Sequence, residues 1–274
     1  MGRQPQHLDL PGAGVRLHAA RWTGPPGPPP LLILHGIWES WRTFAASAER
    51  LSAGRTVYCL DLRGHGASEH PPGGYRFADY AADVRAVLPR LGPVVDVLGH
   101  SLGATVALYA AAGRYAVAGD APARLRRLVA VEPPVLLSED WPAVRADLAR
   151  FRELSRRPVD EILPELPASP ARTEPWRRMI AQALAETDDG VFRAMVEGEQ
   201  GEVDWPALLS RVAADTLAIG ADPAVPGALL TGARMRTLTE GLPSAAVVVL
   251  PAAGHHVEVD SAGCFHALVE EFLG

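Results

Sequence analysis

A serine, a histidine and a carboxylate, residue types that can together catalyse acyl transfer, occur at the ends of predicted strands in this 274-residue chain. The serine lies in "DVLGHSLGATVALYAAAG" (96–113), where an apolar run meets a helical pattern of small residues. Ser101 is flanked there by Gly99 and Gly103, which is typical of a nucleophile on a tight strand-to-helix turn. An ordinary helix N-cap would not explain glycines on both sides, so we expect Ser101 to be a nucleophile.

A serine hydroxyl needs a base that takes its proton. His255, in "LPAAGHHVEVD" (250–260), follows the last predicted strand and precedes the final predicted helix. The adjacent His256 is the alternative. The small residues that precede the two histidines, ending in Gly254, favour His255. We expect His255 to be the base.

The imidazole in turn needs a carboxylate that fixes its tautomer. Asp222 lies two residues past a predicted strand, in a proline-rich turn, and is the favoured candidate. Glu132 ends the preceding strand of the same sheet and is the alternative. Asp215 precedes its strand and is therefore expected at the opposite end of the sheet.

An acyl-transfer site also needs N–H groups that stabilise an oxyanion. The N–H of Leu102 follows the nucleophile directly and lies at a predicted helix N-terminus. A second N–H should come from the loop after the strand at 31–34, where Gly36 allows a sharp turn. Ile37 is the candidate for this N–H, and Trp38 beside it is expected to form a wall of the substrate pocket.

The elements that must position these residues follow an alternating pattern. Nearly continuous apolar strands separated by helices predict a parallel sheet with both faces covered, and ligands bind at the carboxyl ends of such strands. Segments 8–10 and 15–22 predict a β-hairpin at one edge. The other predicted strands are 31–34, 56–60, 94–98, 128–132, 216–220 and 246–250, and helices are predicted over 41–51, 77–91 and 102–112 and after Ser261.

The alternation stops after Glu132. Residues 133–212 contain amphipathic helical patterns and several prolines but no convincing strand, which predicts a helical cap inserted into a core formed by 1–132 and 213–274. The apolar cap residues that could reach substrate are Trp141, Phe151, Leu154, Trp176, Met179, Ile180, Phe192 and Met195.

Composition excludes several classes of function. With 48% hydrophobic and 21% charged residues and a net charge of −6, the chain is typical of a globular protein without a nucleic-acid-binding patch. We expect no metal and no cofactor, because no metal-spaced His/Cys cluster or dinucleotide fingerprint occurs. Cys59 and Cys264 are expected to be free thiols, and no apolar leader or membrane span is predicted, so we expect a cytoplasmic protein. The oligomeric state stays open.

Five motifs together resemble the α/β-hydrolase fold superfamily. They are "LHGIWES" (34–40), "DLRGHGASE" (61–69), "GHSLG" (99–103), "GADPAVP" (220–226) and "AGHHVEVD" (253–260). The resemblance implies a mostly parallel eight-stranded sheet with helices on both faces, a cap over the active site, and structural roles for Arg63, Gly64 and Gly66. The turn that carries Asp222 is one residue shorter than the family's commoner form, so Glu132 stays a candidate for the acid.

The nucleophile indicates the reaction class. Epoxide hydrolases and haloalkane dehalogenases of this fold use aspartate, whereas Ser101 implies an acyl-enzyme. We expect a carboxylesterase-like serine hydrolase that cleaves an ester, thioester, lactone or amide bond of a small or medium apolar acyl substrate. The alternatives are an acyl-transferring or cyclising enzyme of secondary metabolism and a non-catalytic ligand-binding protein.

Overall fold

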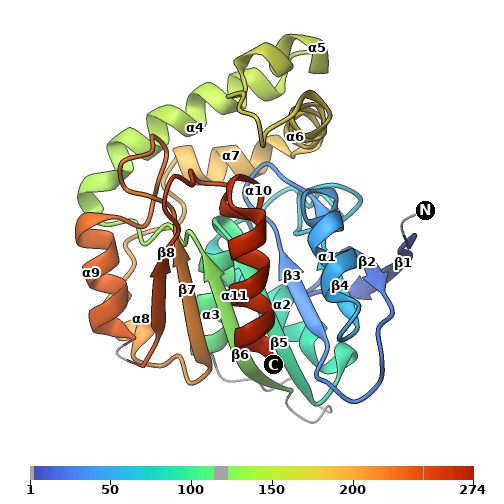
Figure 1. Cartoon of the computed structure of the whole chain (residues 1–274). Helices are drawn as coiled ribbons and strands as arrows, with labels where there is room; N and C mark the ends of the chain where they lie inside the picture. Colours follow the sequence, from blue (N-terminus) through green and yellow to red (C-terminus); the bar gives the residue numbers. More distant parts are fainter. Residues whose placement is uncertain (1–2, 114–122, 243) are drawn as a thin grey trace.

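Eight strands form one sheet in the computed structural model, which describes residues 3–113, 123–242 and 244–274. The strand order is β1-β2-β4-β3-β5-β6-β7-β8, as Figure 1 shows. β1 and β2 form the antiparallel hairpin at one edge, and β3 to β8 run parallel. The strands are β1 (Gln6–Pro11), β2 (Arg16–Trp22), β3 (Leu31–Leu34), β4 (Val57–Leu60), β5 (Val94–His100), β6 (Arg124–Val131), β7 (Asp215–Gly220) and β8 (Ala246–Val249).

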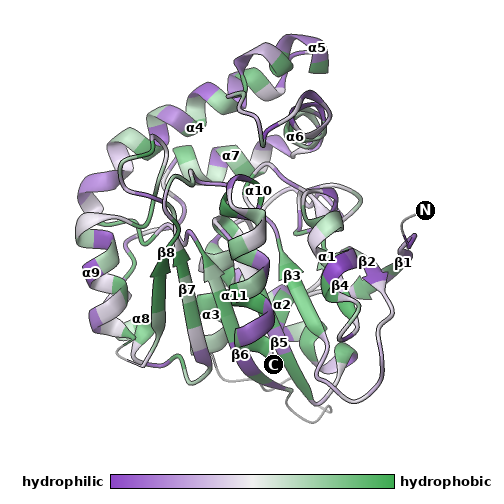
Figure 2. Ribbon diagram, viewed as in Figure 1, coloured by the Kyte–Doolittle hydropathy of each residue, from purple (hydrophilic) through white to green (hydrophobic). Residues whose placement is uncertain are grey.

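The central strands are apolar along their whole length because both faces of the sheet are covered. Every residue of β3 and β4 is buried, and the strands are mostly green in Figure 2. The predicted eight-stranded, mostly parallel α/β sheet is therefore confirmed. The strand bounds differ from the predicted ones by a few residues, most at β6, which begins at Arg124 rather than at 128.

Helices cover both faces of the sheet. α1 (Ala45–Leu51), preceded by a 3-10 turn at Trp41–Phe44, packs with α11 (Ala262–Leu273) on one face. The other face carries α2 (Phe77–Leu91), α3 (Leu102–Ala112), α8 (Trp205–Leu209) and α9 (Gly232–Gly241). The sequence analysis did not predict α9, of which Leu238 alone is fully buried.

Four helices lie over the carboxyl ends of the strands, where Figure 1 shows them above the sheet. They are α4 (Trp141–Ser155), α5 (Val159–Ile162), α6 (Glu174–Glu186) and α7 (Asp189–Val196). α8 falls inside the predicted insertion but packs against α3 and α9, because its apolar residues complete the core cluster on that face of the sheet. The bounds 133–212 for a separate cap domain stay a prediction.

Two further predictions concern the whole chain. Cys59 in β4 is buried and Cys264 on α11 is exposed, and both are free thiols. Among the described residues, the helices are too short or too polar to span a bilayer.

Candidate active site

Ser101 occupies a strained turn between β5 and α3. Its backbone has φ +51° and ψ −117°, in the left-handed region that a residue with a side chain rarely adopts. The Ser101 N–H donates to Val131 O at 2.9 Å, and the Ser101 carbonyl accepts from Ala104 and Thr105. The fold therefore holds the serine in an unfavourable conformation, as occurs at functional sites.

The two flanking glycines make this turn possible. A Cβ at Gly99 would lie 2.3 Å from the Gly103 carbonyl oxygen, and a Cβ at Gly103 would lie 2.3 Å from the Leu34 carbonyl oxygen. Both clashes are with backbone, which cannot rotate away as a side chain can. Any larger residue at either position would separate α3 from the sheet.

His255 points its Nδ1 at a carboxylate buried beneath it. The distance from His255 Nδ1 to Glu132 Oε2 is 3.2 Å, and Glu132 is fully buried at the end of β6. The same carboxylate accepts the N–H groups of Ala221 at 2.8 Å and Leu229 at 2.6 Å. With Nδ1–H donating to Glu132, Nε2 of a neutral His255 carries the lone pair that a base needs.

The electrostatics of this pair suit a neutral histidine beside a charged carboxylate. Burial lowers the pKa of His255, and this effect outweighs the opposing hydrogen bond to Glu132. Burial acts in the other direction on the pKa of Glu132, but the hydrogen bonds from His255, Ala221 and Leu229 outweigh it and hold that pKa below its usual range. Both pKa shifts therefore favour a neutral imidazole beside an ionised carboxylate at neutral pH.

The preference for Asp222 as the partner of His255 is wrong. The Asp222 carboxylate accepts the backbone N–H groups of Ala224 at 2.9 Å and Ala252 at 2.8 Å, and it does not contact the imidazole. The hydrogen bond from Ala224 lies within the turn that carries Asp222, and the hydrogen bond from Ala252 connects this turn to the loop before His255. The alternative named from the sequence, Glu132, makes the contact because its longer side chain reaches from the end of β6.

The two predicted oxyanion N–H groups lie beside the serine. Ile37 and Leu102 both line the cavity that Ser101 lines. Within the part of the chain that the structure describes, neither N–H has an acceptor, so both are free to bind an oxygen of a substrate. Leu102 is also the first residue of α3, where the helix dipole favours negative charge.

The loop at 61–69 supports this region, as the resemblance implied. The buried Arg63 guanidinium pairs with Asp83, with Nε 2.6 Å from Oδ2. Gly66 has φ +51°, and a Cβ there would meet the Asp61 carboxylate at 2.4 Å. His65 contacts the carbonyl of Ile37 through its Nε2 and so fixes the loop that carries the oxyanion N–H.

A cavity of about 330 Å³ lies between helices α4, α6 and α7 and the carboxyl ends of the strands, and Ser101 and His255 open into it. A volume of this size suits a small ligand. Trp38 stacks on Phe151 of α4 with ring centroids 4.2 Å apart, which joins core and cap at the cavity wall. The other apolar residues of the lining are Phe77, Pro134, Leu136, Val144, Leu148, Leu166, Pro167, Trp176, Ile180, Met195, Pro226 and Leu229.

Two of the four predicted substrate-binding residues line this cavity and two do not. Trp38 and Trp176 are in the wall. Trp141 and Met179 are not among the lining residues: Trp141 packs in the main core cluster and Met179 against the small apolar cluster around Ile180 and Leu184. Their contact with substrate stays a prediction. Helical periodicity identifies an apolar face but does not say whether it meets the cavity, the core or another cap helix.

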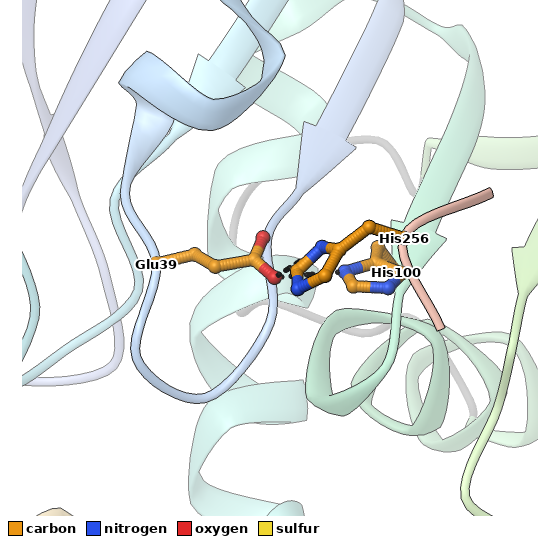
Figure 3. Close-up of side chains that lie close together, drawn as sticks. All are labelled: Glu39, His100 and His256. Atoms are coloured by element: carbon orange, nitrogen blue, oxygen red, sulfur yellow. Dashed lines mark ion pairs between the residues drawn. The ribbon is translucent and has the colours of Figure 1, made fainter. Parts of the chain in front are cut away.

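A buried cluster next to Ser101 and His255 was not predicted from the sequence. Figure 3 shows the Glu39 side chain pointing at the rings of His100 and His256. One potential ligand atom of each lies within 4.8 Å of the other two, a spacing that could hold a metal ion. His100 Nε2 lies 3.0 Å from the carbonyl oxygen of His255, and His100 Nδ1 lies 3.0 Å from Glu39 Oε1 at an ion-pair distance without hydrogen-bond geometry. An imidazolium, which offers no lone pair to a metal, suits both oxygen neighbours. We interpret the cluster as an ion pair.

The sequence model of the alpha/beta hydrolase family matches residues 31–266. The 2-(acetamidomethylene)succinate hydrolase of Mesorhizobium japonicum is 30% identical over 248 residues, which cover 84% of this chain and 82% of that enzyme.

Solved structures share the fold. A crystal structure of E-2-(acetamidomethylene)succinate hydrolase superposes with a TM-score of 0.80 at 23% identity, covering 98% of this chain and 99% of that one. The enol-lactonase of Burkholderia xenovorans gives a TM-score of 0.78 at 23% identity, covering 97% of this chain and 99% of that one.

Proposed function

The chain belongs to the alpha/beta hydrolase family, and we propose that it is a serine hydrolase that cleaves ester-type bonds of small or medium apolar acyl substrates. The observation that carries the proposal is the contact of His255 Nδ1 with Glu132 beside a cavity that Ser101 also lines. A base with an oriented Nε2 and a serine on a strained turn are the parts that nucleophilic acyl transfer requires.

The proposed reaction has two halves. Ser101 Oγ bonds to the substrate carbonyl carbon while its proton passes to His255 Nε2, and the N–H groups of Ile37 and Leu102 bind the oxyanion. Collapse of this intermediate breaks the bond to the leaving group, which takes the proton from His255. A water molecule then attacks the acyl-enzyme, gives its proton to His255, and the acid product leaves as Ser101 is reprotonated.

The lining of the cavity supports an apolar acyl group. Most of its side chains are aliphatic or aromatic, and Arg172, which lines it, is already paired with Asp260 at 2.6 Å. The other charged lining residues apart from the histidines are Glu39, which is paired with His100, and Asp147, whose carboxylate would repel an anion. The named relative acts on a succinate, a dicarboxylate, so we infer that the substrate of this chain differs from it in charge.

The test combines labelling with turnover. We expect a fluorophosphonate to label Ser101 and p-nitrophenyl butyrate to be hydrolysed, with both reactions abolished in Ser101→Ala and retained in the matched surface control Ser210→Ala. Full turnover by folded Ser101→Ala would contradict the proposal. Product analysis with and without added amines and alcohols separates hydrolysis from acyl transfer and cyclisation. Hydrolysis gives the free acid, whereas acyl transfer or cyclisation would give an ester or amide preferentially.

A further inference from the structure

His100 immediately precedes the proposed nucleophile and is fully buried at the end of β5. Its Nε2 lies 3.0 Å from the backbone carbonyl oxygen of His255. Its Nδ1 lies 3.0 Å from Oε1 of Glu39, which comes from the loop after β3 (Figure 3). The His100 ring therefore contacts both the segment that carries His255 and the loop that carries the Ile37 N–H. His100 is also the residue directly before Ser101 in the chain.

Glu39 extends this connection to the oxyanion loop. Its second oxygen, Oε2, accepts the N–H of Gly36 at 3.0 Å, directly before Ile37. A Cβ at Gly36 would lie 2.6 Å from Glu39 Oε1 and 3.2 Å from His100 Nδ1. Because Gly36 has no side chain, the Glu39 carboxylate and the His100 imidazole can lie next to its backbone.

The protonation of His100 follows from its partners. Both ring nitrogens face atoms that only accept hydrogen bonds, and an imidazole donates from both nitrogens only as the imidazolium. Burial acts to lower the pKa of His100, but the charges of Glu39 and Glu258 outweigh it and raise that pKa to about 10. Burial likewise opposes ionisation of Glu39, yet the charge and hydrogen bond of His100 hold the pKa of Glu39 well below its usual range.

We propose that Glu39 and His100 are a positioning pair that fixes the loop of the base and the oxyanion loop relative to the nucleophile. This proposal rests on the proposed function, because it assigns the pair a role in presenting Ser101, His255 and Ile37 to one substrate. The pair acts through backbone atoms, namely the carbonyl of His255 and the N–H of Gly36. A displacement of about 1 Å at such a site can reduce turnover about 100-fold.

The surroundings of the pair make it responsive to pH. His100 faces Glu39, Glu258, His35, His255 and His256. His256 Nδ1 lies 3.2 Å from Glu258 Oε1 and 3.6 Å from Glu39 Oε1. When His100 loses a proton at alkaline pH, one of its nitrogens presents a lone pair to the Glu39 carboxylate or to the His255 carbonyl. One of the two contacts must then break, so activity should fall with a midpoint near the pKa of His100.

Glu39→Gln and Glu39→Ala separate positioning from simple packing. The amide that Glu39→Gln introduces can keep its oxygen on the Gly36 N–H and donate its N–H to Nδ1 of a neutral His100, which still donates from Nε2 to His255. We expect kcat of Glu39→Gln to fall only about threefold, whereas Glu39→Ala and His100→Phe should lose about 100-fold in kcat with KM nearly unchanged. The alkaline fall of activity should be present in the wild type and absent in Glu39→Gln.

A spectroscopic measurement keeps the test valid if the larger changes impair folding. Nitrogen-15 NMR of histidine-labelled protein at pH 8 should show His100 as the imidazolium in the wild type and as the neutral ring in Glu39→Gln. The matched control is His266→Asn, which removes a buried histidine bonded to Ser47 outside the site and should keep wild-type kcat. A neutral His100 in the wild type, or wild-type kcat in folded His100→Phe, would overturn the proposal.

The two proposals fail in different ways. A wild-type protein whose Ser101 does not react with a fluorophosphonate contradicts the proposed hydrolase and with it the catalytic role of the pair. A reactive Ser101 whose labelling rate is the same in wild type, Glu39→Ala and His100→Phe leaves the hydrolase intact and contradicts the positioning pair alone.

Discussion

The Nδ1 atom of His255 lies 3.2 Å from Oε2 of Glu132, although the two residues are 123 positions apart in the sequence. The carboxylate is fully buried and also accepts the backbone N–H groups of Ala221, Leu229 and Leu230, so its position is fixed before any substrate binds. The two carboxylate oxygens of Asp222, which follows the neighbouring strand, accept the backbone N–H groups of Ala224 and Ala252. The acid of the proposed site is therefore Glu132.

Exchange of the two carboxylates for amides tests this assignment directly. Glu132→Gln should lower kcat about 10³–10⁴-fold, because the imidazole loses the partner that fixes its tautomer and stabilises its charge. Asp222→Asn should lower kcat less than about tenfold, because it weakens one loop contact at most. Steady-state kinetics on p-nitrophenyl butyrate measure both, and a larger loss in Asp222→Asn than in Glu132→Gln would refute the assignment.

The pH dependence of kcat/KM should report the protonation of His255. The base must be neutral, so activity is lost as pH falls through its pKa, which burial holds below the usual value of about 6.5. Glu132 raises this pKa, so the residual activity of Glu132→Gln should have its acid limb at still lower pH. An acid limb at higher pH in Glu132→Gln than in the wild type would contradict the proposed pairing.

The glycines around Ser101 should be intolerant of any side chain. Gly103→Ala should destabilise the fold by about 3 kcal/mol or more, since the new methyl group meets the Leu34 carbonyl at 2.3 Å. The matched control is Gly54→Ala, whose Cβ has its nearest neighbour at 3.9 Å and should change stability by less than about 1 kcal/mol. Urea unfolding of both variants measures the difference, and equal stabilities would show that the turn is looser than its geometry indicates.

The charge of the cavity predicts its selectivity. Asp260 pairs with Arg172 and also accepts the Gly254 N–H, a bond that an asparagine oxygen can keep. Asp260→Asn should free the guanidinium and raise kcat/KM for the p-nitrophenyl ester of succinate relative to that of butyrate by about fivefold, equivalent to about 1 kcal/mol. The double variant with Arg172→Gln should lose this gain, and a gain that persists there would exclude Arg172 as its source.

Chelation should leave activity unchanged. The cluster of Glu39, His100 and His256 has the spacing of a metal site, but His100 as the proposed imidazolium would have no lone pair for a cation. Dialysis against EDTA should therefore preserve turnover of p-nitrophenyl butyrate, and elemental analysis should find no stoichiometric transition metal. Loss of activity that zinc restores would instead assign the cluster to a metal.

Much of the fold was predictable because its signals are local. Apolar runs of four to eight residues between helical patterns identify parallel strands, and the glycines around Ser101 identify the turn that joins β5 to α3. The packing of α8 against α3 and α9 was not predictable, because an amphipathic helix has the same pattern whether it covers a sheet or a cap. The same limit explains why helical periodicity did not separate Trp176, which lines the cavity, from Trp141 and Met179, which pack outside its lining.

The sequence by itself determined the sheet, the strained turn at Ser101 and the two acids that could serve His255. Only the tertiary structure decided between those acids, because the choice depends on side-chain reach and on which backbone N–H groups compete for each carboxylate. It also revealed the Glu39–His100 pair. The two residues lie 61 positions apart, in two motifs that the sequence alone does not connect. Hydrogen bonds between distant segments leave no periodic trace in a sequence, so only the folded chain shows them.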